Sequence, residues 1–155
     1  MTAKHLLLVA HAPSPNTLAL AEAVLRGAQH PDVAGVTTRW VQPLHALPED
    51  VLGADGIILG TTENLGYMSG ALKDFFDRCY YPVLEHKQGM PCALYIRAGL
   101  DGTGTRRAVE SIVTGLRWSW AQEPIVMKGD WKEDFLHQAE ELGLFMAAGL
   151  EAGVI

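Results

Sequence analysis

Short continuous runs of apolar residues, each closed by glycine or polar residues, most limit how this chain can fold. Three of them, His5–Ala10, Asp55–Gly60 and Pro91–Ile96, have the length of single strands and contain few polar positions. Such runs are typical of strands covered on both faces, as in parallel sheets whose successive strands are joined by helices. The sequence therefore predicts an α/β fold.

Two further strands and four helices complete the predicted series. Val36–Val41 alternates in polarity and is rich in β-branched residues, and Glu123–Lys128 is a second short run. Apolar residues at helical spacing predict helices at about 17–28, 70–81, 104–118 and 132–150. Strands alternating with helices call for a parallel sheet with helices on both faces, and 155 residues suit one domain spanning 1–155.

Charge and composition exclude several classes of partner. A formal net charge of -6 would repel nucleic acid and anionic membrane surfaces, so neither is expected as a partner. The N-terminal apolar run Leu6–Ala10 is too short to span a membrane and lacks a signal-peptide cleavage pattern, so a cytoplasmic protein is expected. Cys79 and Cys92 form no CxxC pair and no metal-ligand set, and both are interpreted as core residues.

The loop His11–Thr17 joins the first strand to the first helix, at the edge where parallel α/β sheets bind ligands. Unpaired amides and the helix dipole favour an anion there, and Ser14, Asn16 and Thr17 add neutral donors without any lysine or arginine. This donor set suits a small phosphate held by hydrogen bonds. Helix capping by the same three residues is the alternative. No GxGxxG motif follows the first strand, which argues against a dinucleotide fold.

Two segments resemble one known family. Residues 11–17, His-Ala-Pro-Ser-Pro-Asn-Thr, are similar to the phosphate loop of flavodoxins. Residues 60–78, Gly-Thr-Thr-Glu-Asn-Leu-Gly-Tyr-Met-Ser-Gly-Ala-Leu-Lys-Asp-Phe-Phe-Asp-Arg, resemble the second flavin loop of NAD(P)H-dependent FMN reductases and multimeric flavodoxin-like quinone reductases. The resemblance implies a flavodoxin-like three-layer sandwich, with a five-stranded parallel sheet in the order 2-1-3-4-5.

The resemblance also implies an FMN site built from three loops. The phosphate would lie among Ser14, Asn16, Thr17 and Leu18. The ribityl chain and isoalloxazine edge would lie against Thr62, Glu63, Asn64, Leu65 and Gly66, mainly against backbone amides, with Tyr67 beside the ring. The third loop would contribute Arg97, Gly99, Asp101 and Gly102, and a flexible turn is its alternative reading.

Two positions depart from the family pattern. Pro15 stands where the phosphate loop commonly has glycine, and Thr62 stands where the second loop commonly has proline. Pro15 removes one backbone N–H that could have faced the phosphate. No metal ligand and no protein acid, base or nucleophile is expected, because the flavin carries the chemistry.

The function implied is an FMN-binding oxidoreductase that passes electrons from NAD(P)H to a quinone or flavin acceptor. A flavodoxin-type electron carrier without its own turnover and a binding module that has lost FMN are the alternatives. A homodimer or homotetramer is expected, with the apolar stretch Leu142–Ile155 available either for an interface or for a core helix. No segment indicates where a nicotinamide would bind.

Overall fold

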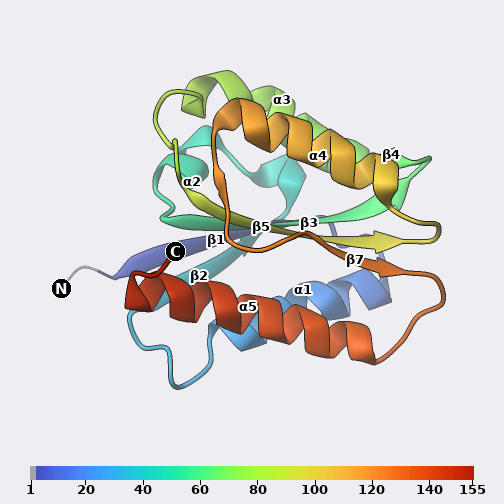
Figure 1. The fold of residues 1–155 in the computed structure, drawn as a ribbon, viewed down its shortest axis with the longest axis horizontal. Helices are drawn as coiled ribbons and strands as arrows, with labels where there is room; N and C mark the ends of the chain where they lie inside the picture. The colour runs from blue at the N-terminus through green and yellow to red at the C-terminus, as the bar shows by residue number, and fades with distance from the viewer. Residues whose placement is uncertain (1–2) are drawn as a thin grey trace.

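The computed structural model describes residues 3–155 and contains one sheet with helices on both faces (Figure 1). The parallel strands β2, β1, β3 and β5 lie side by side in that order, and β6 and β7 pair with β5 on its other side. The antiparallel strand β4 extends β3. The strands are β1 (Lys4–Ala10), β2 (Val36–Val41), β3 (Gly56–Asn64), β4 (Tyr67–Met68), β5 (Pro91–Ala98), β6 (Ser119–Trp120) and β7 (Ile125–Lys128).

Two helices cover each face of the sheet. In Figure 1, α3 and α4 lie above the sheet, and α1 and α5 lie below it. Two short elements, η1 and α2, follow β2 on the α3 side. The helices are α1 (Pro15–Ala28), η1 (Pro43–His45), α2 (Pro48–Leu52), α3 (Gly70–Val83), α4 (Thr103–Leu116) and α5 (Asp134–Ala152). No helix in the described part of the chain is long and apolar enough to cross a membrane.

Side chains of the buried strands alternate between two hydrophobic cores. In β3, Ile57 and Leu59 pack toward α3 and α4, whereas Ile58 packs toward α1 and α5. All three are fully buried, because both faces of the sheet are covered. The continuous apolar runs in the sequence reflect this double coverage.

Glycines let α1 and α5 pack backbone to backbone. A Cβ on Gly27 would stand 1.9 Å from the carbonyl oxygen of Glu140, and one on Gly143 would stand 2.0 Å from that of Val24. Neither distance leaves room for a methyl group. Leu142, the first residue of the predicted interface stretch, is buried in the core of its own chain, as are Met146, Ala147 and Leu150. The core-helix interpretation of this stretch therefore fits the structure.

The predicted fold class and the order of the five parallel strands are confirmed, and the sheet is larger than predicted. The expected loop over 61–68 is instead the end of β3 followed by a hairpin to β4. Two short strands occupy the position of the predicted fifth strand. β6 pairs with the start of β5, and β7 pairs with the end of β5. The helix over 70–81 continues through Pro82 to Val83.

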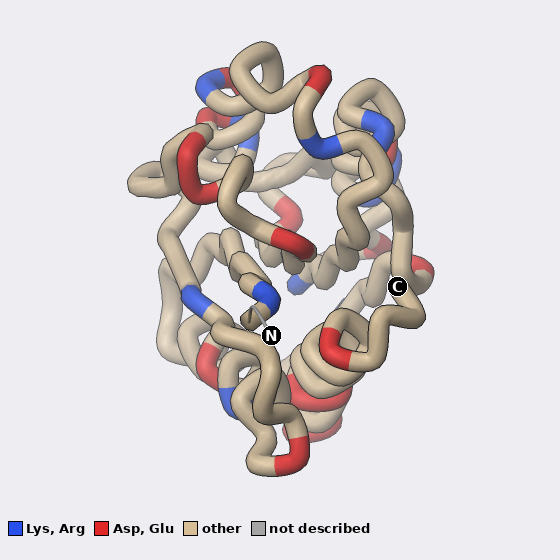
Figure 2. Tube along the Cα trace, turned by 90° about the vertical axis from the view of Figure 1, so that its left-hand side faces the viewer, with Lys and Arg blue, Asp and Glu red and all other residues tan. Residues whose placement is uncertain are grey.

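The start of β1 and the end of α5 both lie at the amino ends of the strands, opposite the edge where the predicted ligand loops emerge (Figure 1). Figure 2 is viewed from that end and shows acidic and basic segments interspersed along the trace. No continuous stretch of one sign stands out there. In parallel α/β sheets, ligands bind at the carboxyl ends of the strands, so a ligand site is expected at the opposite edge.

Candidate functional site

The carboxyl ends of β1, β3 and β5 bring three loops to one edge of the sheet. Gly60 in β3 is in register with Ala10 of β1 and with Tyr95 of β5. The His11 N–H donates to the carbonyl of Gly60 at 3.0 Å, which holds the first loop against β3. The three predicted segments therefore converge, although they are far apart in sequence.

Ser14 and Thr17 form a reciprocal cap at the start of α1. The Ser14 N–H donates to Thr17 Oγ1 at 2.9 Å, and the Thr17 N–H donates to Ser14 Oγ at 3.2 Å. Their hydroxyls lie 2.8 Å apart. The helix-capping interpretation therefore describes these two side chains.

Asn16 is the donor that this cap leaves free. Its side chain is exposed, and neither its amide group nor its peptide N–H has a hydrogen-bond partner among residues 3–155. Pro15 occupies the first helical position, where a missing N–H costs the helix nothing. No acidic residue lies in the first turn of α1, so this turn carries no negative charge that would oppose an anion.

The second loop is a tight hairpin between β3 and β4. Its two turn residues, Leu65 and Gly66, both have positive φ, +53° and +74°, the pattern of a type I′ turn. Leucine is disfavoured in this conformation, and its side chain is fully exposed. At the base, the Ser69 N–H donates to Thr61 Oγ1 at 3.0 Å, and Thr62 Oγ1 donates to Asn64 Oδ1 at 2.8 Å.

Glu63 joins the second loop to the third. One carboxylate oxygen accepts the Leu100 N–H at 2.9 Å, and the other accepts the Gly102 N–H at 2.8 Å. The loops also touch directly, since a Cβ on Gly104 would stand 2.1 Å from the carbonyl oxygen of Gly66. The two loops therefore form one connected unit at the sheet edge.

The third loop turns sharply into α4. Gly102 has a φ of +70°, and a Cβ there would stand 2.7 Å from Val126 Cγ1, so glycine is required for both reasons. Asp101 Oδ1 accepts the N–H of Thr103, the first residue of α4, at 3.0 Å. This bond is the main cause that lowers the pKa of Asp101 below its usual value.

Arg97 lies beside the third loop but is directed elsewhere. Its Nη1 donates to the carbonyls of Ala98 and Met127 at 2.9 and 3.0 Å. The guanidinium also lies 5.1 Å from the ring centroid of Phe135 and 5.8 Å from that of Trp131. Arg97 thus fastens the ends of β5 and β7 to α5.

Aromatic and histidine residues near the edge differ in exposure. Tyr67, on β4, is 40% exposed, whereas Trp118 is buried in the core on the α3 and α4 side of the sheet. His11 is half-buried in a groove of about 350 Å³ that also contains Pro43, His45 and Ala71. Burial lowers the pKa of His11, which favours the neutral form of its imidazole. The sequence did not predict this groove, because η1, which lines it, was not predicted.

The two cysteine side chains lie in the core of the molecule. Both cysteines are free and buried in the core facing α3 and α4, as predicted. Burial raises the pKa of Cys79 to about 11 and that of Cys92 to about 12, so both stay protonated. No group of three or more potential metal ligands occurs among the described residues.

Known proteins resemble this chain over the residues that form the three loops. A family model described as NADPH-dependent FMN reductase matches residues 8–127, which include all three loops. A curated protein named flavodoxin from Aquifex aeolicus is 34% identical over 101 residues, or 65% of this chain. The match covers 54% of that protein, so this chain corresponds to about half of the relative's length.

Solved structures share the fold at lower identity. A flavodoxin from the domain Archaea superposes with a TM-score of 0.79 at 18% identity, covering 95% of this chain and 99% of the other. A flavodoxin described as WrbA-like, from Agrobacterium tumefaciens, gives 0.75 at 19% identity, covering 97% and 99%. These likenesses establish the three-layer fold.

Proposed function

The chain belongs to the NADPH-dependent FMN reductase family, and from this membership we propose that it oxidises NADPH and delivers the electrons to a quinone or to a second flavin. The overall reaction converts NADPH, a proton and a quinone into NADP⁺ and a hydroquinone. The observation that carries the proposal is the convergence of three loops at one sheet edge, within the residues that match the family.

The first loop has a donor set suited to the phosphate of FMN. Asn16 offers a free side-chain amide and a free peptide N–H at the positive end of α1. Ser14 and Leu18 are exposed beside it, and Thr17 is buried behind it as part of the cap. Neutral donors in a helical turn that has no acidic residue fit an exposed phosphate monoester. In this proposal Asn16 is the main phosphate ligand, and Ser14 and Thr17 shape the loop.

The second and third loops would hold the ring and the ribityl chain. Thr62, Asn64, Gly66 and Tyr67 lie on the exposed side of the hairpin, and Gly99 has no heavy atom within 4 Å of where a Cβ would lie. Glu63 acts by positioning, because its carboxylate is already bound to the amides of Leu100 and Gly102. Asp101 accepts the first N–H of α4, and Arg97 joins the end of β5 to β7 through the carbonyl of Met127.

Bound FMN supplies hydride acceptance and one- or two-electron transfer. The task left to the chain is to hold the donor and the acceptor at the same edge and to keep the loops rigid. The bonds from Glu63 and the contact between Gly104 and Gly66 provide that rigidity. No protein acid, base or nucleophile is needed for this role.

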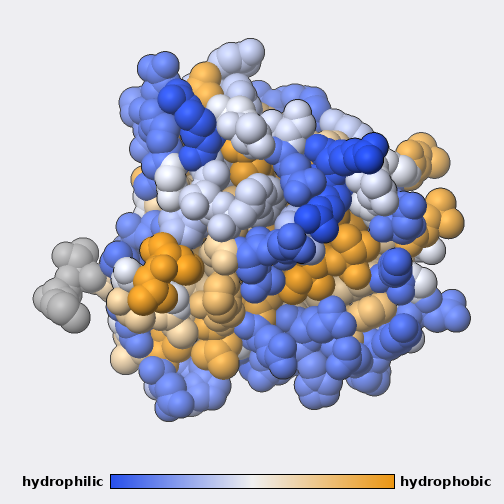
Figure 3. Space-filling view, in the orientation of Figure 1, coloured by the Kyte–Doolittle hydropathy of each residue, from blue (hydrophilic) through white to orange (hydrophobic). Residues whose placement is uncertain are grey.

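Exposed leucines at the site favour an apolar acceptor. Leu65 is 105% exposed at the tip of the second loop, and Leu100 is 76% exposed on the third. Because Glu63 joins the two loops, both leucines lie on the same rim. Figure 3 shows hydrophobic side chains protruding at this end of the molecule. Apolar residues on a site rim suit the ring of a quinone better than a polar acceptor.

The proposal is tested by mixing the purified chain with FMN, NADPH and a naphthoquinone and following absorbance at the nicotinamide band. Oxidation that requires the chain, FMN and the quinone together supports the proposal. NADPH that stays reduced under these conditions, with the flavin bound, contradicts it.

An electron-carrier function is the second candidate, favoured by the name of the curated relative, flavodoxin. A carrier would receive its electrons from a separate reductase rather than from NADPH. Adding a flavodoxin reductase to the same assay separates the two functions. Turnover without the reductase favours the family's enzymatic function, and turnover only with it favours the carrier.

A homodimer or homotetramer stays a prediction. The C-terminal stretch contributes Leu142, Met146 and Leu150 to its own core, which leaves Phe145, 41% exposed, as an apolar side chain of α5 that can meet another chain. Light scattering during gel filtration measures the assembly directly.

A further inference from the structure

A basic groove lies on the far side of the third loop, between α4 and β7. It has a volume of about 430 Å³, and its cationic side chains are Arg106, Arg107 and Lys128. The other lining residues are Asp101, Thr103, Glu110 and Val126. Figure 3 shows strongly hydrophilic side chains over the region between α4 and β7. None of the three cations was among the residues predicted from the sequence.

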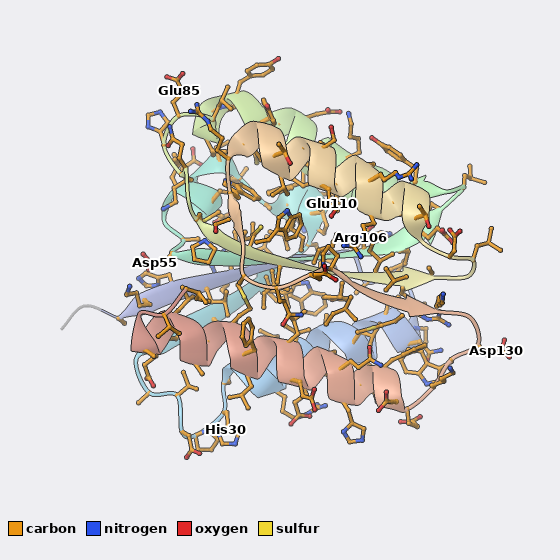
Figure 4. The ribbon with its side chains drawn as sticks, in the orientation of Figure 1. His30, Asp55, Glu85, Arg106, Glu110 and Asp130 are labelled. Carbon is orange, nitrogen blue, oxygen red and sulfur yellow. The ribbon has the colours of Figure 1, made fainter. Side chains whose placement is uncertain are left out.

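Two of these cations lack an ionic partner. The chain carries 12 Lys and Arg against 18 Asp and Glu, so unpaired cations gathered in one groove run against its overall charge. Arg106 is paired with Glu110, at 3.4 Å, and Figure 4 shows both side chains extending from α4. Among residues 3–155, no carboxylate oxygen lies within 4 Å of the charged groups of Arg107 or Lys128. Both side chains are exposed and available to an anion.

The backbone fixes this groove against the candidate site. Lys128 ends β7 and is in register with Ala98, the last residue of β5. The close approach of Gly102 to Val126 holds the third loop against β7. The same loop is tied to the second loop by Glu63 on its other side. The cations therefore border the loop unit proposed to hold the flavin.

We propose that this groove binds the 2′-phosphate at the adenosine end of NADPH and thereby selects NADPH over NADH. The inference rests on the proposed function, in which a nicotinamide nucleotide is the electron donor. A guanidinium offers a planar fork of donors to a phosphate, and a nearby ammonium adds a second positive charge. The first amide of α4 is already occupied by Asp101, so the side chains of Arg107 and Lys128 carry the recognition.

Asp101 should oppose phosphate binding, whereas Arg107 and Lys128 should favour it. Its carboxylate is exposed on the rim of the groove, and the bond from the Thr103 N–H lowers its pKa by stabilising the charged form. A phosphate in the groove would be repelled by this charge. Asp101→Asn retains an oxygen that can accept the Thr103 N–H and removes the charge, so it should tighten binding of the phosphorylated nucleotide.

The test measures binding of 2′,5′-ADP (adenosine 2′,5′-bisphosphate) and 5′-AMP by calorimetry, since the two probes differ only in the 2′-phosphate. The wild type should bind 2′,5′-ADP about tenfold more tightly or better, the size of one charge-assisted hydrogen bond. The double variant Arg107→Ala/Lys128→Ala should lose this preference, and Asp101→Asn should increase it. The matched control Arg26→Ala/Lys87→Ala removes two positive charges elsewhere and should leave the preference unchanged.

Kinetics with the FMN-loaded protein separate this inference from the proposed function. The double variant should lose kcat/KM for NADPH by about tenfold while kcat/KM for NADH stays near the wild-type value. NADPH preference that survives in the double variant, or equal binding of 2′,5′-ADP and 5′-AMP by the wild type, overturns the phosphate site while the reductase function stands. Failure of both nucleotides to reduce the flavin-loaded wild type overturns the proposed function itself.

Discussion

The carboxylate of Glu63 accepts the backbone N–H of Gly102 at 2.8 Å, across 39 residues of sequence. Its second oxygen accepts the N–H of Leu100 at 2.9 Å. Through this one side chain, the hairpin that follows β3 fixes the loop that follows β5. The rigidity of the candidate flavin site therefore depends on a residue that need not touch the flavin.

Glu63→Gln should weaken FMN binding by about tenfold, because a glutamine has one acceptor oxygen and cannot accept both amides with a full charge. Hydrogen exchange at Leu100 and Gly102 should become faster in the same variant. Fluorescence titration with FMN and exchange mass spectrometry measure the two effects.

Glu85→Gln is the matched control, since Glu85 is exposed at the opposite end of the molecule (Figure 4). It should change neither quantity. Unchanged FMN affinity in Glu63→Gln, with faster exchange at both amides, would show that the connection between the loops does not matter for the flavin.

Leu65→Asn should separate stability from function. Asparagine tolerates the left-handed conformation that Leu65 adopts, so the free energy of unfolding should rise by about 1 kcal/mol. The change also removes an exposed apolar side chain from the site rim, so kcat/KM for a quinone should fall. Urea unfolding and steady-state kinetics test the two parts. A variant that is more stable and equally active with quinones would exclude Leu65 from acceptor binding.

Asn16→Ala should weaken FMN binding without destabilising the fold, because the Asn16 side chain is exposed and has no partner. Ser14→Ala should in addition lower the free energy of unfolding by about 1 kcal/mol, since it breaks the cap of α1. Riboflavin lacks the phosphate, so its affinity should be unaffected by Asn16→Ala. Equal losses for FMN and riboflavin would place Asn16 away from the phosphate.

Stability should fall as the pH rises above about 9. Burial raises the pKa of Cys92 to about 12 from an ordinary value of 9.0, so between these pH values the unfolded chain loses this proton and the folded chain keeps it. Cys79 acts in the same direction, with a pKa raised to about 11. Cys92→Ala should therefore lose less stability between pH 8 and pH 10.5 than the wild type. Urea unfolding at the two pH values measures the difference, and identical losses in both proteins would contradict the assignment.

The sequence was sufficient for the parallel strands because their apolar runs match strands covered on both faces, as Ile57, Ile58 and Leu59 show. It was insufficient for the β3–β4 hairpin, since Leu65 is not a residue type that signals a type I′ turn. The two-residue strand β6 is too short to leave a periodic pattern.

Site features formed by distant residues were also beyond sequence reasoning. Glu63 was predicted to line the flavin, but its bonds to Leu100 and Gly102 depend on the register of β3 and β5. Arg107 and Lys128 become neighbours of one groove only when β7 pairs with β5. By contrast, the cap formed by Ser14 and Thr17 depends on neighbouring residues alone. Helix capping was one of the two interpretations of this loop, beside phosphate binding.

Equilibrium titration of the purified wild-type chain with FMN tests whether the three loops at this edge of the sheet form an FMN site. The predicted result is saturable quenching of flavin fluorescence with one FMN per chain and weaker binding of riboflavin. Flavin fluorescence that stays unchanged through the titration, with the chain shown to be folded by circular dichroism, would contradict the claim.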